Sequence, residues 1–176
     1  MLHGERVRLR AIERTDLARC VRWFNDPDVV RHLTIYAPLS MAQEERWFER
    51  LQDDESRHLF AIETEDAEHI GNLGLEDLNW KDRSAQLGIA IGHKGHWGHG
   101  YGTDAVRTVL RFAFEELNLH RVWLTVHDDN PRAIRCYEKC GFRREGLDRE
   151  ARYSDGAYHD SFRMGILDYE FKHTQD

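Results

Sequence analysis

The chain has 176 residues, of which 40% are hydrophobic, and this length suits one domain with its own core. Its 32 acidic and 25 basic side chains give a formal charge of −7, which disfavours nucleic acid as a partner. No apolar run approaches the roughly 20 residues that span a bilayer, and the three cysteines match no metal-binding spacing. We therefore expect one cytoplasmic domain over residues 1–176, with reduced thiols and no membrane or nucleic-acid partner.

The first half of the chain predicts a strand, two helices and three more strands. Charged and apolar residues alternate over residues 5–13, as in a half-buried strand. Thr15 can cap a helix that stops near residues 25–28, and Ser40 with Gln43 makes a capping box for a second helix. Three consecutive strands are predicted at residues 58–64, 69–80 and 84–92.

The second half predicts two helices that alternate with strands. Apolar residues recur at helical spacing from Thr103 onward, and a strand follows at residues 121–128. Asn130 can cap the next helix, which has proline in its first turn and ends at Gly141. Two strands close the chain, "FRREGLDREARY" and "YHDSFRMGILDYEF", joined by the turn "SDGA". The order gives an α/β (α+β) domain with a mixed, mostly antiparallel sheet of seven strands and about four helices.

The glycines of "HKGHWGHGYGTDA", residues 93–105, indicate an anion-binding loop. Gly98, Gly100 and Gly102 precede a helix, where backbone N–H groups and the helix dipole favour a phosphate. The spacing fits neither the Walker loop nor the dinucleotide fingerprint, which argues against a kinase or a dehydrogenase.

Three histidines in the same loop raise the alternative of a metal site. His93, His96 and His99 would share a face only in a helix, which the glycines disfavour, and no carboxylate or thiol accompanies them at ligand spacing. We expect incidental loop histidines and no metal cofactor, although adventitious nickel or zinc binding stays open.

Two motifs together resemble the GNAT superfamily of acetyl-CoA-dependent N-acetyltransferases. They are "WGHGYGTDAV" and "NPRAIRCYEKCGFRREG", and the likeness extends over nearly the whole chain. The opening "VRLRAIERTDL" and the ending "YHDSFRMGILDYEF" are similar to the group of ribosomal-protein N-terminal and spermidine acetyltransferases. The resemblance implies the GNAT fold, acetyl-CoA as cosubstrate and a homodimer as a possible assembly.

The resemblance also implies a coenzyme site. The loop amides would bind the pyrophosphate, and the backbone near Ile89 and Ile91 would meet the acetyl carbonyl. Trp97 replaces the Arg or Gln that the family prefers. Asn130 falls on a family position, although it is also a sufficient N-cap. The full set is Ile89, Ile91, Trp97, Gly98, His99, Gly100, Tyr101, Gly102, Thr103, Asn130, Ala133 and Tyr137.

The catalytic residues are assigned unequally. By resemblance Tyr137 is the general acid, whereas its helical spacing alone favours a packing residue. Relatives often carry a carboxylate where this chain has Gln86, so Glu76 and Asp77 are the base candidates, with solvated strand carboxylates as the equal alternative. Cys136 and Cys140 lack an evident histidine base, which favours direct attack in a ternary complex.

The acceptor residues are predicted from the segment after the first strand and from the final hairpin. Aromatic and acidic side chains there would suit a cationic amine, although tryptophan on an amphipathic helix is more often core. The candidates are Tyr36, Glu44, Trp47, Gln86 and Tyr158. The expected acceptor is a polyamine or a protein or peptide N-terminus. The alternatives are acyl transfer to an amino-sugar amine and a non-catalytic acyl-CoA sensor.

Overall fold

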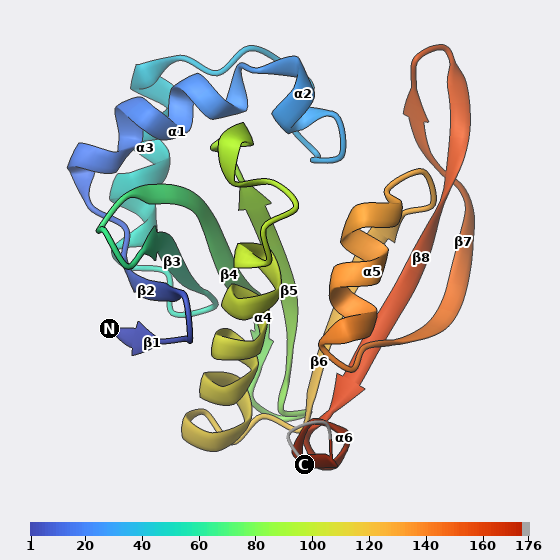
Figure 1. Cartoon of the computed structure of the whole chain (residues 1–176). Coiled ribbons are helices and arrows are strands. Elements are labelled where there is room, and N and C mark those ends of the chain that lie inside the picture. The colour runs from blue at the N-terminus through green and yellow to red at the C-terminus, as the bar shows by residue number, and fades with distance from the viewer. Residues whose placement is uncertain (174–176) are drawn as a thin grey trace.

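The structure, a computed structural model, describes residues 1–173 as one twisted sheet with helices against it (Figure 1). The strands lie in the order β1-β2-β3-β4-β5-β6-β8-β7, and every neighbouring pair is antiparallel except β5 and β6. The strands are β1 (Leu2–His3), β2 (Val7–Ala11), β3 (His58–Thr64), β4 (His69–Asn79), β5 (Ser84–Ile91), β6 (Arg121–His127), β7 (Arg143–Ser154) and β8 (Ala157–Leu167). The helices are α1 (Leu17–Phe24), α2 (Pro27–Val30), α3 (Met41–Leu51), α4 (Tyr101–Arg111), α5 (Pro131–Lys139) and α6 (Asp168–His173).

The predicted fold class is confirmed, and the additional elements are short. Beyond the seven expected strands the structure has the two-residue β1, and beyond the four expected helices it has α2 and α6. Asp26 caps α2 at the point where the first helix was expected to end, because its carboxylate accepts the backbone N–H of Asp28 at 3.0 Å. The prediction of Thr15 as a cap is wrong, since Glu13 caps a 3-10 turn that precedes α1.

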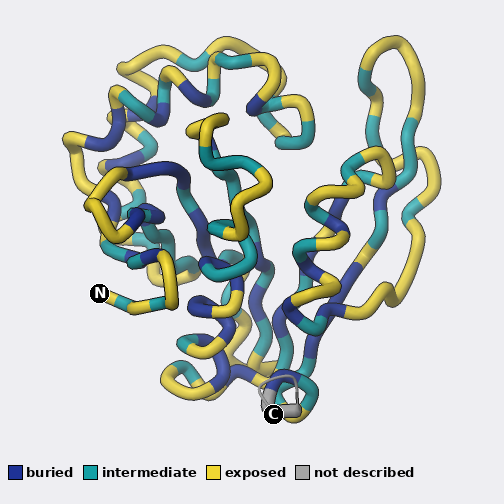
Figure 2. The backbone as a smooth tube through the Cα atoms, viewed as in Figure 1, coloured by how far each residue is buried: buried dark blue, intermediate teal, exposed yellow. Residues whose placement is uncertain are grey.

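Helices cover the two faces of the sheet unequally. Neighbouring residues on a strand point to opposite faces, and on β3 the buried Ile62 joins the main core with α4, whereas Ala61 packs with Phe48 of α3. The main core continues over β6 and β8 and includes Ile134 of α5. Buried residues accordingly follow the strand centres in Figure 2, while the tip of the β7–β8 hairpin is exposed.

The parallel pair β5–β6 is joined only at its beginning. The register runs from Ser84–Arg121 to Gln86–Trp123, and beyond it β5 stays paired with β4 while β6 stays paired with β8. The two strands therefore diverge along their remaining length, as Figure 1 shows, and they open the sheet toward the glycine loop. Among the described residues no helix is long and apolar enough to cross a membrane.

Gly92 directly follows β5 and lies against the indole of Trp23. Substitution of this glycine tests how tightly the two residues pack. A Cβ at Gly92 would lie 2.1 Å from Trp23 Cδ2, so we expect Gly92→Ala to lower the free energy of unfolding by about 1–3 kcal/mol. Gly146→Ala on β7 is the matched control, because a Cβ there meets nothing within 4 Å. Urea denaturation of both variants would contradict the packing argument if their losses were equal.

Candidate active site

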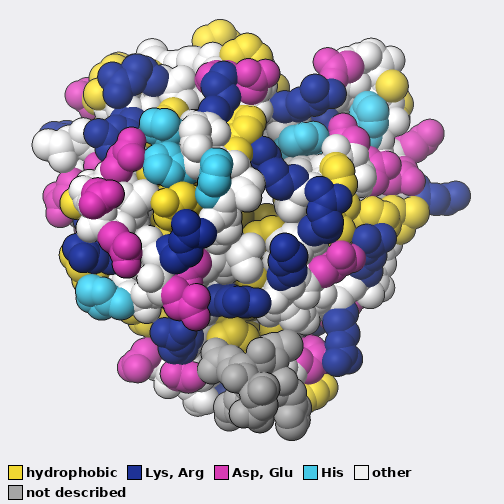
Figure 3. All heavy atoms as spheres, in the orientation of Figure 1, with side chains coloured by type: hydrophobic (Ala, Val, Ile, Leu, Met, Phe, Trp, Pro, Cys, Tyr) yellow, Lys and Arg dark blue, Asp and Glu magenta, His cyan; other side chains and the backbone are white. Residues whose placement is uncertain are grey.

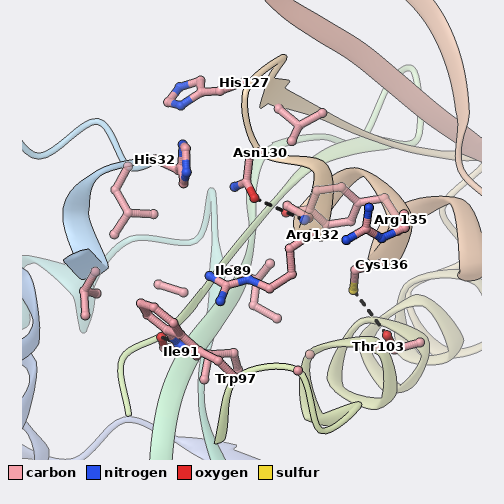
Figure 4. Close-up of a pocket in the computed structure, with 18 of the residues that line it drawn as sticks. His32, Ile89, Ile91, Trp97, Thr103, His127, Asn130, Arg132, Arg135 and Cys136 are labelled. Atoms are coloured by element: carbon pink, nitrogen blue, oxygen red, sulfur yellow. Dashed lines mark hydrogen bonds between the residues drawn. The ribbon is translucent and has the colours of Figure 1, made fainter. Parts of the chain in front are cut away.

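A cavity of about 410 Å³ occupies the gap between β5 and β6. Its walls come from residues 28–33, the end of β5, the glycine loop, the end of β6 and the inner face of α5. Figure 4 shows these side chains converging from both halves of the opened sheet. One cavity therefore receives a loop of backbone donors on one side and a helix of polar side chains on the other.

The glycine loop is held in the shape that its sequence allows. Gly98 and Gly100 have φ angles of +79° and +87°, and Gly100 caps α4 in the left-handed region that favours glycine. One turn later the carboxylate of Asp104 accepts three backbone N–H groups, from Glu5, Arg6 and Val7, at 2.8–3.1 Å. These hydrogen bonds fix the turn before β2 to the first turn of α4. They thereby restrict the movement of the glycine loop that precedes α4.

Trp97 forms a bridge within the cavity wall. Its indole Nε1 donates to the carbonyl oxygen of Ile91 at 2.7 Å, and the guanidinium of Arg132 lies 4.2 Å from the centre of its ring. The indole thus satisfies a carbonyl at the end of β5 and stacks with a cation of α5. The side chain that departs from the family pattern therefore links the two walls of the cavity (Figure 4).

Helix α5 presents both predicted family residues to the cavity. The Asn130 side chain accepts the backbone N–H of Ala133 at 3.2 Å, as expected of an N-cap. Tyr137 is buried in the core against Phe142 and also lines the cavity, and burial raises the pKa of its hydroxyl. The packing and functional interpretations of this tyrosine are thus compatible, and its hydroxyl stays protonated at neutral pH.

Cys136, one residue before Tyr137, also lines the cavity. The hydroxyl of Thr103 donates to its sulfur at 3.4 Å. The neighbouring Cys140 thiol, followed by the Thr103 hydroxyl, lowers the pKa of Cys136 against the opposing effect of burial. The Thr103 hydroxyl donates to its sulfur and the Cys140 thiol is its neighbour, and neither is a proton acceptor comparable to an imidazole.

Two histidines face each other at the far end of the cavity. The rings of His32 and His127 lie 5.8 Å apart, and Asp129 comes within 3.4 Å of His32 Nδ1. Burial, together with the charge of Arg152, lowers the pKa of His127 to about 4, and burial also lowers that of His32. Both imidazoles are therefore neutral at pH 7.

A lysine connects this end of the cavity with the glycine loop. Lys94 Nζ lies 2.8 Å from Asp26 and 2.8 Å from Asp28, the two carboxylates at the start of α2. Asp28 lines the cavity, and Lys94 begins the 3-10 turn that leads to the glycines. The two segments are thus joined by two ion pairs that share one lysine.

Most of the predicted coenzyme residues gather at the cavity, and the other predicted site residues do not. Ten of the twelve line it: Ile89, Ile91, Trp97, Gly98, Gly100, Gly102, Thr103, Asn130, Ala133 and Tyr137. His99 and Tyr101 lie behind the loop, where Arg6 donates to the His99 carbonyl and stacks on the Tyr101 ring at 4.7 Å. Their assignment, like that of the whole set, remains a prediction about a bound coenzyme.

The predicted base and acceptor residues lie elsewhere. Glu76 lies opposite Gln86 in the β4–β5 register, Asp77 is exposed in a bulge, and none of the three lines the cavity. Tyr36 and Tyr158 are exposed by 98% and 65%, and neither belongs to the cavity wall.

The two remaining acceptor candidates lie on α3. Trp47 packs onto the small core beside Phe48, so its core interpretation fits the structure. Glu44 is buried, which raises the pKa of its carboxyl to about 7, but it does not line the cavity.

A basic face of α5 was missed by the sequence analysis. Arg132, Arg135 and Lys139 all line the cavity, and their spacing of three and four residues places them on one side of a helix. That spacing was visible in the sequence. The histidines at the far end could not be found in the same way, because His32 and His127 are brought together only by the fold.

Comparisons with known proteins agree with this geometry. A family model described as an acetyltransferase (GNAT) domain matches residues 6–143. The spermidine N(1)-acetyltransferases of Vibrio cholerae and Escherichia coli are 31% and 28% identical, and the matches cover 96% and 94% of this chain and 96% and 88% of theirs. The crystal structure of the Vibrio cholerae enzyme with CoA and spermine superposes with a TM-score of 0.88, at 31% identity over 94% of this chain and 98% of that one.

The lowered pKa of His127 predicts an acid-sensitive fold. Between its ordinary pKa of 6.5 and the folded value of about 4, the unfolded chain binds more protons, so acidification favours unfolding. We expect the free energy of unfolding to fall over this range, and His127→Gln to flatten the fall. The exposed His3→Gln is the control. The free energy of unfolding is measured by denaturation at each pH. The same dependence on pH in wild type and His127→Gln would refute the assignment.

Proposed function

The chain belongs to the GNAT family of acetyl-CoA-dependent N-acetyltransferases, and from this membership we propose that it acetylates a primary amine by direct attack in a ternary complex. The family indicated by the two sequence motifs is thereby confirmed, and so is acetyl-CoA as cosubstrate. The observation that supports the proposal best is the cavity, which combines a glycine loop, a basic helix face and a buried tyrosine.

The residues present fit a coenzyme that carries a pyrophosphate. Backbone N–H groups at the start of α4, after glycines with positive φ, suit a pyrophosphate. Arg132, Arg135 and Lys139 add three positive charges on the facing helix. When bound, acetyl-CoA supplies an acetyl group activated as a thioester.

Tyr137 holds the proton that the departing thiolate needs. The amine nitrogen forms a bond to the acetyl carbon as the carbon–sulfur bond breaks, and the departing sulfur takes the hydroxyl proton of Tyr137. The raised pKa keeps that proton in place until it is needed. Beyond Gln86 the edge of β5 has no β6 partner, so its backbone donors can stabilise the carbonyl oxygen.

The acceptor nitrogen must lose a proton, and the candidate bases differ in position. Glu76 and Asp77 remain the predicted carboxylates, although neither lines the cavity. His32 and His127 do line it and are neutral at pH 7, but their lowered pKa values make both of them weak bases. Direct attack, rather than transfer through Cys136, is supported by the partners of that sulfur, which are a hydroxyl and a second thiol.

Polyamines are the first acceptor class to test, because two of the relatives are named for spermidine. A specific observation favours peptide N-termini as the second class. Asp28 is the one carboxylate in the described cavity wall, whereas a polyamine carries several positive charges. Lys94 already pairs with Asp28, so a single ammonium group would leave fewer positive charges unmatched in the cavity than a polyamine would.

A thiol-release assay with acetyl-CoA and a panel of amines tests the function. We expect CoA to appear in step with an N-acetylated product for a polyamine or a peptide N-terminus, while glucosamine represents the amino-sugar alternative. Coenzyme binding without turnover on any amine would contradict the enzyme proposal and would favour an acyl-CoA sensor.

Removal of the Tyr137 hydroxyl tests the proton donor. We expect Tyr137→Phe to lower kcat by about 100-fold or more at every pH, with little change in KM for acetyl-CoA. Tyr169→Phe on α6 is the matched control, since Tyr169 is exposed and does not line the cavity. Full kcat in Tyr137→Phe across the pH range would remove this residue from the mechanism.

A further inference from the structure

Three side chains with metal-binding donors meet at the rim of the cavity. Glu68 comes from the turn before β4, and His93 and His96 come from the segment after β5. The backbone accounts for their meeting. β4 and β5 are antiparallel with Gly71 opposite Ile91, and the N–H of His93 extends the pairing by donating to the Ile70 carbonyl at 3.0 Å.

The two histidines share a side because the glycine-rich segment contains a helical turn. A 3-10 turn forms over Lys94–His96, and the N–H of His96 donates to the His93 carbonyl at 3.0 Å. Side chains three residues apart in a 3-10 helix lie above one another. Neither this turn nor a carboxylate partner was predicted from the sequence, and the structure contains both.

The three donor groups lie within 4.8 Å of one another, and the carboxylate is close to both imidazole nitrogens. Glu68 Oε1 lies 3.4 Å from His93 Nε2, and Glu68 Oε2 lies 3.0 Å from His96 Nε2. Zinc bonds of about 2.1 Å in tetrahedral geometry separate neighbouring ligands by about 3.4 Å. We propose that Glu68, His93 and His96 bind a divalent transition-metal ion of the zinc type, with water at the fourth position.

The surroundings allow a cation to enter. Glu68 and His93 are exposed, and histidines gather on the surface beside the hollow in Figure 3. The nearest cation in the sequence, Lys94, is matched by its two aspartates. A second group of His32, His127 and Asp129 differs in this respect, because the Arg152 guanidinium lies 3.1 Å from that aspartate and competes with a metal.

A bound ion would act on the loop and not on the acetyl group. His96 packs edge-on against Tyr101 in the first turn of α4, with 5.1 Å between the ring centres. The ion would therefore join the turn before β4 to the segment that enters the glycine loop. It would stabilise the loop as an added cross-link of the native state.

Metal titration of the full chain, without a polyhistidine tag, tests the site. We expect one Zn²⁺ per chain by calorimetry and a tetrahedral visible spectrum with Co²⁺. His96→Gln and Glu68→Gln should each weaken the affinity by about tenfold or more, since even an indirect partner of a ligand contributes that much. His99→Gln is the matched control, as His99 is in the same loop but outside the group.

A second measurement does not depend on the stoichiometry. Zn²⁺ should raise the melting temperature of wild type and of His99→Gln, and at the same Zn²⁺ concentration it should raise that of His96→Gln less. Affinities that are the same in wild type, His96→Gln and Glu68→Gln, or a loss in His99→Gln as large as theirs, would overturn the proposal.

Discussion

The site depends on a parallel strand pair that is joined over only three residue pairs. β5 and β6 exchange hydrogen bonds from Ser84 to Gln86 and then separate, each still held by its antiparallel neighbour. Because the outer pairings are continuous, the gap costs few hydrogen bonds and does not close by itself. Trp97 maintains one side of it by satisfying the Ile91 carbonyl. The edge of β5 beyond Gln86 has no β6 partner, so its backbone groups are available to a ligand.

Local patterns predicted the elements well because their causes lie within a few residues. The capping box of Ser40 and Gln43, the Asn130 cap and the bounds of β3 depend on neighbours in sequence, and the structure agrees with each of them. The ends of the chain were harder. The last predicted strand continued through residues that form α6, because an alternating pattern does not mark the point where strand pairing ceases.

The two halves of the cavity also differed in how well the sequence predicted them. The loop and α5 are contiguous motifs, so their residues could be assigned in groups, and only the basic face of the helix was overlooked. The opposite wall is assembled from α2 and the end of β6, which are nearly a hundred residues apart. Exposed or core aromatics such as Tyr36 and Trp47 could not be excluded, since their burial depends on how the helices cross. Likewise, Glu68 reaches His93 through strand register alone.

Lys94 has a consequence for anyone who would redesign this protein. Its two aspartates belong to the helix that walls the far end of the cavity, while its own backbone leads into the glycine loop. Substitutions in that helix, chosen to admit a different small molecule, would also release the loop from one of its anchors. Ligand selectivity at the α2 end of the cavity and binding at the glycine loop are therefore coupled. A library of variants in α2 alone will change both properties at once.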